Sequence, residues 1–216
     1  MINLYNQDCM EAMAGFDDNQ FDLAIVDPPY GIDADKKNNG KHSDTHEKTS
    51  IAKINNYKKT NWDNSIPNDD YFAGLKRVSK KQIVWGANFF NLKGGMLYWH
   101  KQVTMPSYSQ GELAWLSWLN KIDFVDIAWH GMIQHDMKNK EVRIHPTQKP
   151  VKLYEWILMN YAKEGDKILD THLGSGSIAI ACHNLGYDLE GYELDKDYYI
   201  EAKKRLEEHQ AQLRMF

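Results

Sequence analysis

The apolar run at residues 21–26 is followed at once by two prolines, Pro28 and Pro29, and this junction limits what the chain can fold into. The run is apolar except at one position and ends in two β-branched residues, which is typical of a buried strand in a parallel sheet. Proline supplies no backbone donor and fixes φ, so the chain must leave the sheet directly after the strand. Asp27 and Tyr30 are therefore expected just beyond its carboxyl end, where open α/β sheets bind their ligands.

The residues of this junction combine a carboxylate, a free carbonyl and an aromatic ring. Asp27 and the Pro28 carbonyl can accept hydrogen bonds from a planar amino group, and Tyr30 can stack on the ring that carries it. The pattern thus predicts a site for a nucleobase. The alternative is a plain turn after a strand, because these residue types are also common in turns.

Length and composition indicate one globular domain. The chain has 216 residues, of which 42% are hydrophobic and 26% charged, and this suits a single well-buried core. We expect a cytoplasmic protein without a membrane partner, because no apolar run approaches a membrane span and the first residues lack a secretory pattern. Cys9 and Cys182 lie far apart in apolar helical contexts, so we expect packing residues rather than a disulfide or nucleophiles.

The overall charge and the local charge point in different directions. A formal net charge of −4 argues against binding a polyanion through overall charge. Residues 36–59, however, carry seven lysines and only two acidic residues, and such a segment can reach nucleic-acid phosphates, although a solvated loop is the alternative. His42 and His46 are four apart in this segment, but it is not convincingly helical and offers no cysteine, so we predict no metal site.

Hydrophobic periodicity alternates between strand and helix along the chain. This alternation predicts an α/β fold with a mostly parallel sheet that is covered by helices on both faces. The expected strands are residues 2–5, 21–26, 82–86, 96–100, 124–129, 167–170 and 189–192. The expected helices are residues 9–14, 71–79 after a cap at 67–70, 112–119, 151–162, 178–184 and 197–213.

A second motif near the C-terminus combines a strand, a glycine-rich turn and a helix start. Gly174 and Gly176 lack a Cβ, so backbone can lie against a ligand, and the following helix N-terminus offers donors to an anionic group. Glu193, at the end of the next strand, stands where a carboxylate takes a ribose diol. The motif indicates an adenosine-containing cofactor, either a dinucleotide or S-adenosylmethionine. The dinucleotide fingerprint is weakened because Ala179 stands near the position of its third glycine.

Together the two motifs resemble those of the beta-class DNA amino-methyltransferases, in which an Asp-Pro-Pro-Tyr motif precedes a Phe-x-Gly-x-Gly motif. The resemblance covers nearly the whole chain in the family's order. It implies a single-domain Rossmann-like methyltransferase fold with a mostly parallel seven-stranded sheet, S-adenosylmethionine as cofactor, DNA as partner and a place in restriction-modification. The matching stations are Asp8-Cys9, Asp27 to Tyr30, His145 to Pro150, Asp170 to Ser177, and Gly191 to Asp195 with Tyr198, Ala202 and Arg205 behind it.

The resemblance also implies roles for individual residues. Asp27 and the Pro28 carbonyl would accept the amino hydrogens of a flipped-out adenine, and Tyr30 would stack on its ring. Aspartate at the first position of the catalytic motif most often accompanies adenine, so the implied activity is adenine-N6 methylation. The implied catalytic residues are Asp27, Pro28, Pro29 and Tyr30.

The implied cofactor site draws on several segments of the chain. Asp8 would read the cofactor's adenine and Glu193 its ribose. Thr147 and Lys149 would close over its methionine carboxylate, while Asp170 and the glycine-rich turn would hold the rest of the methionine part. The complete implied set is Asp8, Cys9, Asp27, Thr147, Lys149, Asp170, His172, Gly174, Ser175, Gly176, Glu193 and Leu194.

Two positions depart from the family pattern. His172 replaces the Phe of the cofactor motif, and Thr171 replaces the Pro that usually precedes it. An imidazole packs much as a phenyl ring does, so we expect binding to survive, with a pH dependence through His172.

We expect a division of labour within the single domain. Residues 1–100 would form a catalytic half with a mobile loop at 31–65, and residues 146–216 a cofactor-binding half. Residues 101–145 would supply a short target-recognition segment, which predicts a short or relaxed recognition sequence.

Other acceptors and other kinds of protein remain open at this point. Cytosine N4 or an RNA base is the nearest alternative acceptor, and a catalytically silent cofactor-binding or DNA-binding partner subunit is the rival of another class. Related enzymes are often dimers, so a homodimer is expected by resemblance, although no residues identify an isologous patch.

Overall fold

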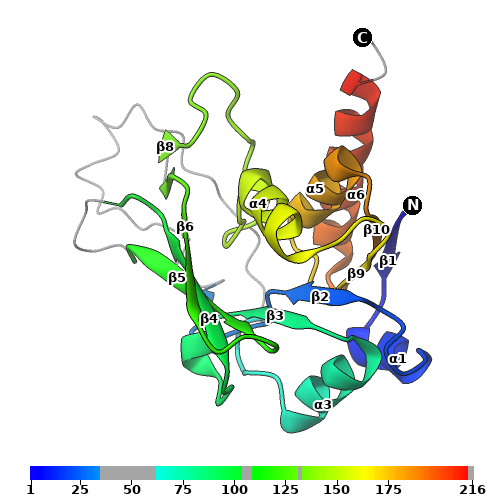
Figure 1. The fold of residues 1–216 in the computed structure, drawn as a ribbon. Coiled ribbons are helices and arrows are strands. Elements are labelled where there is room, and N and C mark those ends of the chain that lie inside the picture. Colours follow the sequence, from blue (N-terminus) through cyan, green and yellow to red (C-terminus); the bar gives the residue numbers. More distant parts are fainter. Residues whose placement is uncertain (35–61, 104–108, 131–132, 214–216) are drawn as a thin grey trace.

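The computed structural model describes residues 1–34, 62–103, 109–130 and 133–213, which form an α/β fold around one large sheet (Figure 1). The sheet has eight strands in the order β1-β10-β9-β2-β3-β5-β4-β6. All eight run in one direction except β5, which is antiparallel to both neighbours. Their bounds are Ile2–Asn6 (β1), Leu23–Val26 (β2), Gln82–Trp85 (β3), Gly95–His100 (β4), Gly111–Leu116 (β5), Ile122–Asp126 (β6), Lys167–Asp170 (β9) and Asp188–Glu193 (β10); a separate hairpin pairs Trp129–His130 (β7) with Ile133–Gln134 (β8).

Helices pack on both faces of the sheet, and this explains the composition of the central strands. All four residues of β2 are buried. Leu23 and Ile25 join the core on one face, while Ala24 and Val26 join the core on the other, because successive strand side chains point to opposite faces. The first core is covered by α4 (Val151–Tyr161), α5 (Ser177–Leu185) and α6 (Lys196–Leu213), and the second by α1 (Cys9–Ala14) and α3 (Asp69–Val78) (Figure 1).

Local sequence signals account for several helix ends. The Asn68 side chain accepts a hydrogen bond from the Tyr71 amide at 3.1 Å and so caps α3. Asp8 caps α1 in the same way through the Met10 amide at 2.7 Å. Gly186 ends α5 with φ of 77°, a left-handed conformation that favours glycine.

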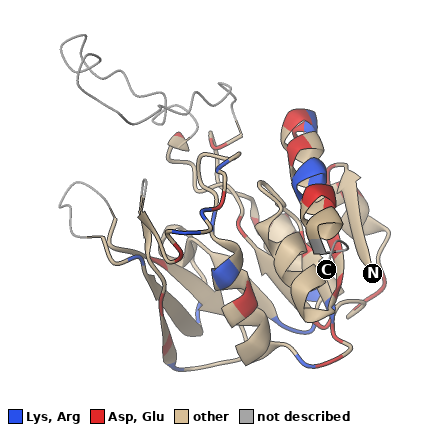
Figure 2. Ribbon diagram, turned by 90° about the horizontal axis from the view of Figure 1, so that it is seen from above, with Lys and Arg blue, Asp and Glu red and all other residues tan. Residues whose placement is uncertain are grey.

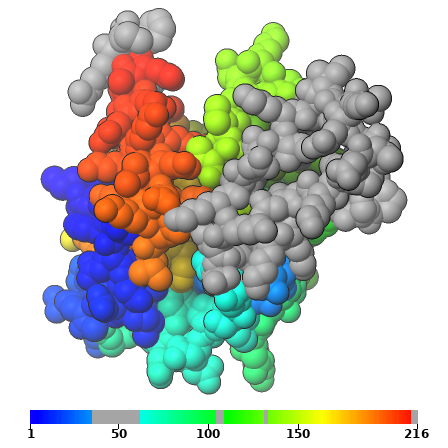
Figure 3. Space-filling view, turned by 180° about the vertical axis from the view of Figure 1, so that it is seen from behind, coloured from blue at the N-terminus to red at the C-terminus, as the bar shows by residue number. Residues whose placement is uncertain are grey.

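The first and last parts of the described chain lie side by side. β1 pairs in parallel with β10, from Ile2 opposite Leu189 to Asn6 opposite Glu193. The N-terminal segment and α6 occupy the same face of the surface (Figure 3). Basic and acidic residues both occur along α6, as expected for a solvated face (Figure 2).

The predicted fold class is confirmed, with two corrections. The sheet has eight strands rather than seven. Residues 112–119, predicted as a helix, belong largely to β5, which lies between β3 and β4. The helix prediction failed because Ala114, Trp115 and Leu116 are all buried, so the alternation that marks a half-buried strand is missing.

The predicted recognition segment and loop are only partly described. Within residues 101–145, β5 and β6 are strands of the main sheet, so much of this predicted segment helps to build the sheet. Residues 35–61 of the predicted mobile loop, including the whole basic segment at 36–59 with His42 and His46, lie outside the described residues. Among the residues that are described, no helix has the length and apolar character needed to cross a membrane.

Candidate active site

Polar residues at the carboxyl ends of β1, β10, β9 and β2 surround one cavity. The chain's path through the sheet reverses between the neighbours β9 and β2, the position at which open α/β sheets bind ligands. The cavity has a volume of about 760 Å³. Its walls include these residues of the expected site: Asp8, Cys9, Asp27, Pro29, Thr147, Lys149, His172, Gly174, Ser175, Glu193 and Leu194. The remaining expected residues, Pro28, Tyr30, Asp170 and Gly176, are not among the residues that line this cavity.

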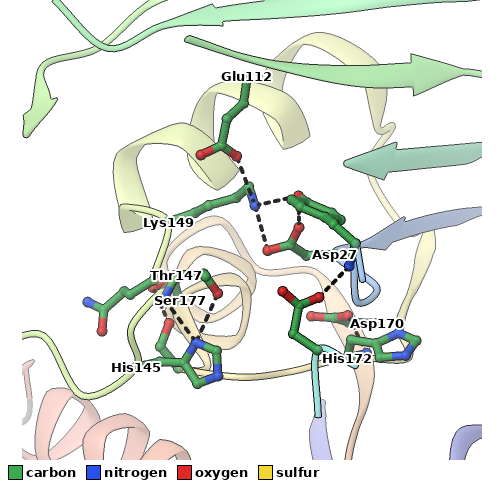
Figure 4. Close-up of polar contacts among 12 residues, drawn as sticks. Asp27, Glu112, His145, Thr147, Lys149, Asp170, His172 and Ser177 are labelled. Atoms are coloured by element: carbon green, nitrogen blue, oxygen red, sulfur yellow. Dashed lines mark hydrogen bonds and ion pairs between the residues drawn. The ribbon is translucent and has the colours of Figure 1, made fainter. Parts of the chain in front are cut away.

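Asp27 is held on both carboxylate oxygens (Figure 4). The Tyr30 hydroxyl donates to Oδ1, and the Lys149 ammonium donates to Oδ2 at 2.5 Å. Burial raises the pKa of Asp27 above its ordinary value, and the Lys149 charge opposes this rise. Each carboxylate oxygen has two acceptor positions, so Asp27 can still accept hydrogen bonds from a further donor.

Glu112, on β5, shares the Lys149 ammonium with Asp27 and was missed by the sequence reasoning. Lys149 Nζ lies 3.2 Å from Glu112 Oε2, and Lys101 pairs with the other oxygen. Although burial favours the neutral acid, Lys149 and Lys101 lower the pKa of Glu112 to about 2. Burial also works to lower the pKa of Lys149, but Asp27 and Glu112 hold it above its ordinary value. The cluster is therefore a balanced set of two cations and two carboxylates.

The ring of Tyr30 is fixed by the turn that follows β3. Phe89 stacks on it with ring centroids 4.9 Å apart, and Phe90 approaches edge-on at 6.2 Å. Gly86, with φ of 76°, passes so close that a Cβ there would lie 2.2 Å from Tyr30 Cε1. A glycine at this position is needed both for the backbone conformation and for the room that Tyr30 occupies.

Asp63 fixes the backbone after the two prolines. Its carboxylate accepts hydrogen bonds from the amides of Tyr30 at 2.7 Å, Gly31 at 2.9 Å and Ala34 at 2.8 Å. Asp63 is only 1% exposed although it comes from a polar tract without hydrophobic periodicity. Nothing in the sequence pattern distinguishes it from the other polar residues of that tract.

The glycine-rich turn is tied to the end of β10 by Glu193, whose Oε2 accepts from the Gly174 amide at 2.8 Å. Gly174 has φ of 52°, and a Cβ there would meet the His145 ring only at 3.8 Å, so the turn faces the cavity. Gly176 acts differently, because its Cβ would lie 3.1 Å from that of Ala202 on α6. The sequence predicted that Gly176 makes room for a ligand, whereas in the structure its missing Cβ makes room for α6.

The family model described as DNA methylase (N6_N4_Mtase) matches residues 79–204. The chain belongs to the DNA methylase family. It is 41% identical over 69 residues to the type II methyltransferase M.HpaI of Haemophilus parainfluenzae. These residues make up 32% of this chain and 22% of that protein. It is also 40% identical over 80 residues to the type II methyltransferase M2.DpnII of Streptococcus pneumoniae. These residues make up 37% of this chain and 30% of that protein. The matched stretch thus spans less than a third of either relative.

Solved structures agree with the DNA methylase fold. The M1.HpyAVI-SAM complex has a TM-score of 0.58 at 22% identity, covering 95% of this chain and 100% of that one. The cytosine-N4-specific PvuII DNA methyltransferase has a TM-score of 0.58 at 13% identity, covering 94% and 85%. At these identities the likeness establishes the fold.

Two residues that line the cavity have pKa values shifted far from their ordinary values. Burial, followed by the nearby Asp8 charge, raises the pKa of Cys9 to about 12, so its thiol is protonated at neutral pH and is no nucleophile. Burial lowers the pKa of His172 to about 4, although the Asp8 charge opposes this. The expected pH dependence through His172 is therefore placed well below the physiological range.

His172 is also anchored on one nitrogen. Its Nδ1 lies 2.9 Å from Thr171 Oγ1, and Thr171 Oγ1 lies 2.7 Å from the buried Tyr71 hydroxyl. If Tyr71 donates to Thr171, Thr171 can donate to His172, and the hydroxyl protons of Tyr71 and Thr171 then both have an acceptor. The His172 backbone amide in turn donates to Asp170 at 3.0 Å, so Asp170 supports the turn without lining the cavity.

The cavity suits an adenosine-bearing molecule. Its volume lies in the range of cofactor sites. The Asp8 and Glu193 carboxylates provide acceptors in its wall, and Leu194 offers an apolar side chain that is 70% exposed. Trp62 Nε1 is buried in the same wall and has no hydrogen-bond partner among the described residues, so a bound molecule can supply one. These features fit S-adenosylmethionine.

Proposed function

We propose that this protein transfers the methyl group of S-adenosylmethionine to the N6 amino group of adenine in DNA. The shared cavity carries this proposal, because Asp27 of the first motif and Gly174 of the second line the same space. A donor bound along the glycine-rich turn would lie next to an amino group held at Asp27. Family membership supports DNA as the substrate, and the aspartate of the first motif favours adenine.

S-adenosylmethionine supplies an electrophilic methyl group when it is bound. Asp8 and Glu193 would accept hydrogen bonds from its adenosine part, and Gly174 would let backbone lie against its methionine part. Residues 146–216 would thus contribute most of the cofactor site, with Asp8 added from the first half of the chain.

Asp27 and the Pro28 carbonyl would accept hydrogen bonds from the two N–H groups of the target amino group. This orients the nitrogen lone pair toward the methyl carbon, and the fixed Asp27 needs no reorganisation during the reaction. The base must leave the duplex to reach the cavity, because its amino nitrogen is inaccessible to in-line attack inside the stack. Stacking of the base on Tyr30 stays a prediction.

The experiment is a methyl-transfer assay with labelled S-adenosylmethionine and a panel of duplex DNA, single-stranded DNA and RNA, followed by nucleoside mass spectrometry. We expect N6-methyladenine in DNA. N4-methylcytosine, or methylation of RNA alone, would replace the proposed acceptor, and binding of the cofactor without transfer to any acceptor would indicate a silent partner subunit. Light scattering of the same sample tests the predicted homodimer.

Asp27→Asn and Asp27→Ala test the residue assignment. We expect Asp27→Ala to reduce turnover by about a hundredfold or more, because the amino group loses its principal acceptor, and Asp27→Asn, which loses the charge but keeps a carbonyl oxygen, to reduce it less. Cofactor affinity, measured by isothermal titration calorimetry, should change little. Glu155→Gln is the matched control, because Glu155 lies on α4 and pairs with Lys152 outside the cavity. Unchanged methyl transfer in Asp27→Ala would defeat the assignment.

A further inference from the structure

Glu112 is a buried carboxylate without a place in the two sequence motifs, yet it is bound to the residue that holds Asp27. It lies on β5, the antiparallel strand, whereas Asp27 follows β2 and Lys149 precedes α4. The Lys149 side chain is 3% exposed, and its ammonium is shared between Asp27 Oδ2 at 2.5 Å and Glu112 Oε2 at 3.2 Å (Figure 4). Three separate segments therefore meet at one ammonium.

Apolar and aromatic surroundings limit where this ammonium can lie. It sits 5.0 Å from the ring centroid of Trp85 and 5.9 Å from that of Tyr30. Trp85 is fully buried, so that side of the ammonium is closed to bulk solvent. A buried cation must stay paired, and the two carboxylates are its partners in this site. Lys101 holds Glu112 from the other side, which anchors that carboxylate independently of Lys149.

From these contacts we infer that Glu112 is a positioning residue for methyl transfer, which acts through Lys149 to fix the orientation and charge of Asp27. This inference rests on the proposed function of Asp27. It assigns Lys149 to the acceptor side of the cavity, whereas the resemblance assigned it to the carboxylate of the cofactor. Glu112 touches neither substrate nor cofactor in this account.

The charges around Asp27 make the inference testable by pH. The Glu112 charge raises the pKa of Asp27, and the Lys149 charge lowers it. Removing one or the other should therefore move the acid limb of the rate profile in opposite directions. The ionised Asp27 is the stronger acceptor, so Glu112→Gln should shift the limb to lower pH and Lys149→Met should shift it to higher pH.

The other groups that face Asp27 keep their charge over this range. Burial raises the pKa of Asp170, on β9, to about 8, so it is neutral across the acid limb. Tyr71 of α3, Tyr154 of α4 and Tyr30 are neutral because burial raises the pKa of each well above 10. The opposite shifts are thus expected to come from Glu112 and Lys149.

The kinetic experiment compares wild type, Glu112→Gln, Glu112→Asp and Lys149→Met over pH. We expect Glu112→Gln to lower kcat about ten- to hundredfold with little change in KM for S-adenosylmethionine, because a small misplacement of the acceptor slows the chemistry without weakening cofactor binding. Glu112→Asp keeps the charge but shortens the side chain, so kcat should recover partly and the acid limb should stay near that of wild type. Glu155→Gln is again the control.

A second readout does not need activity. Carbon-13 NMR of labelled aspartate, with the Asp27 signal assigned from Asp27→Asn, reports the pKa of Asp27 directly in wild type, Glu112→Gln and Lys149→Met. Opposite shifts in the two variants support the inference even if the protein methylates none of the acceptors tested, in which case the proposed function alone fails. Shifts in the same direction, or a Glu112→Gln variant with wild-type kcat and pH profile, would overturn it.

Discussion

Replacing Gly86 by alanine should disturb Tyr30 directly. A Cβ at this position would lie 2.2 Å from Tyr30 Cε1, 2.6 Å from Cδ1 and 2.7 Å from Cζ. Tyr30 cannot move without losing contacts, because its ring is stacked on Phe89 and its hydroxyl donates to Asp27. Tyr30 must therefore tilt away, and its hydrogen bond to Asp27 should be lost.

A matched control separates this contact from the backbone cost. Gly165 has φ of 85°, similar to the 76° of Gly86, but a Cβ at Gly165 would meet nothing within 4 Å. Both Gly→Ala variants pay about 1–2 kcal/mol for a left-handed alanine, offset in part by about 0.4–1 kcal/mol from a stiffer unfolded chain. Only Gly86→Ala adds overpacking, which typically costs about 1–3 kcal/mol.

The assay is thermal unfolding followed by methyl-transfer kinetics on both variants. For a chain of this size, a difference of about 1–3 kcal/mol corresponds to a Tm difference of roughly 2–12 °C between them. Gly86→Ala should also lose about tenfold or more in kcat with little change in cofactor affinity, while Gly165→Ala keeps wild-type kinetics. Equal Tm values and equal kcat values for the two variants would refute the reasoning, because the contact with Tyr30 would then cost nothing.

Other predictions follow from buried groups. His172→Phe should make the free energy of unfolding less sensitive to acid. Because the pKa of His172 is lowered to about 4, the wild type loses stability as pH falls below about 6.5, by about 1.4 kcal/mol per pH unit. Chemical denaturation at pH 6.5 and 5 should show a smaller loss in the variant. Asp170→Asn should remove a pH effect of the opposite direction, because a carboxyl pKa raised to about 8 means that the wild type loses stability as pH rises from about 4 to 8. A variant whose free energy of unfolding has the same pH slope as that of wild type over this range would contradict this. Asp63→Ala should slow methyl transfer without weakening cofactor binding, because it removes the acceptor that fixes three part-buried amides after the prolines. Asp63→Asn, which keeps a carbonyl oxygen, should be milder in the same assay.

The parts of the site that follow strands were predictable from the sequence. The prolines after residues 21–26 and the glycines after Asp170 both mark places where the chain leaves a sheet, and both lie at the predicted edge. Parallel strands end at a common edge, so the meeting of the two motifs followed from the fold class. The structure places both in one cavity.

The parts that depend on pairing between distant segments were not predictable. Glu112 was placed on a helix because its strand is buried along half its length and shows no alternation. Its role depends on Lys149 and Lys101, and nothing local to any of the three indicates that they meet. The close approach of Gly176 to α6 was not predictable for a similar reason, because only the packing of α6 reveals that a Cβ at Gly176 would meet Ala202.

The pairing of β1 with β10 has a consequence for how the protein is made. Asp8 follows β1 and Glu193 ends β10, so the cavity wall requires residues that lie far apart in the sequence. β2 likewise pairs with β9, which comes much later in the sequence. A nascent chain therefore cannot assemble the ligand site until β10 has emerged from the ribosome, and long-range pairing of this kind makes folding slow.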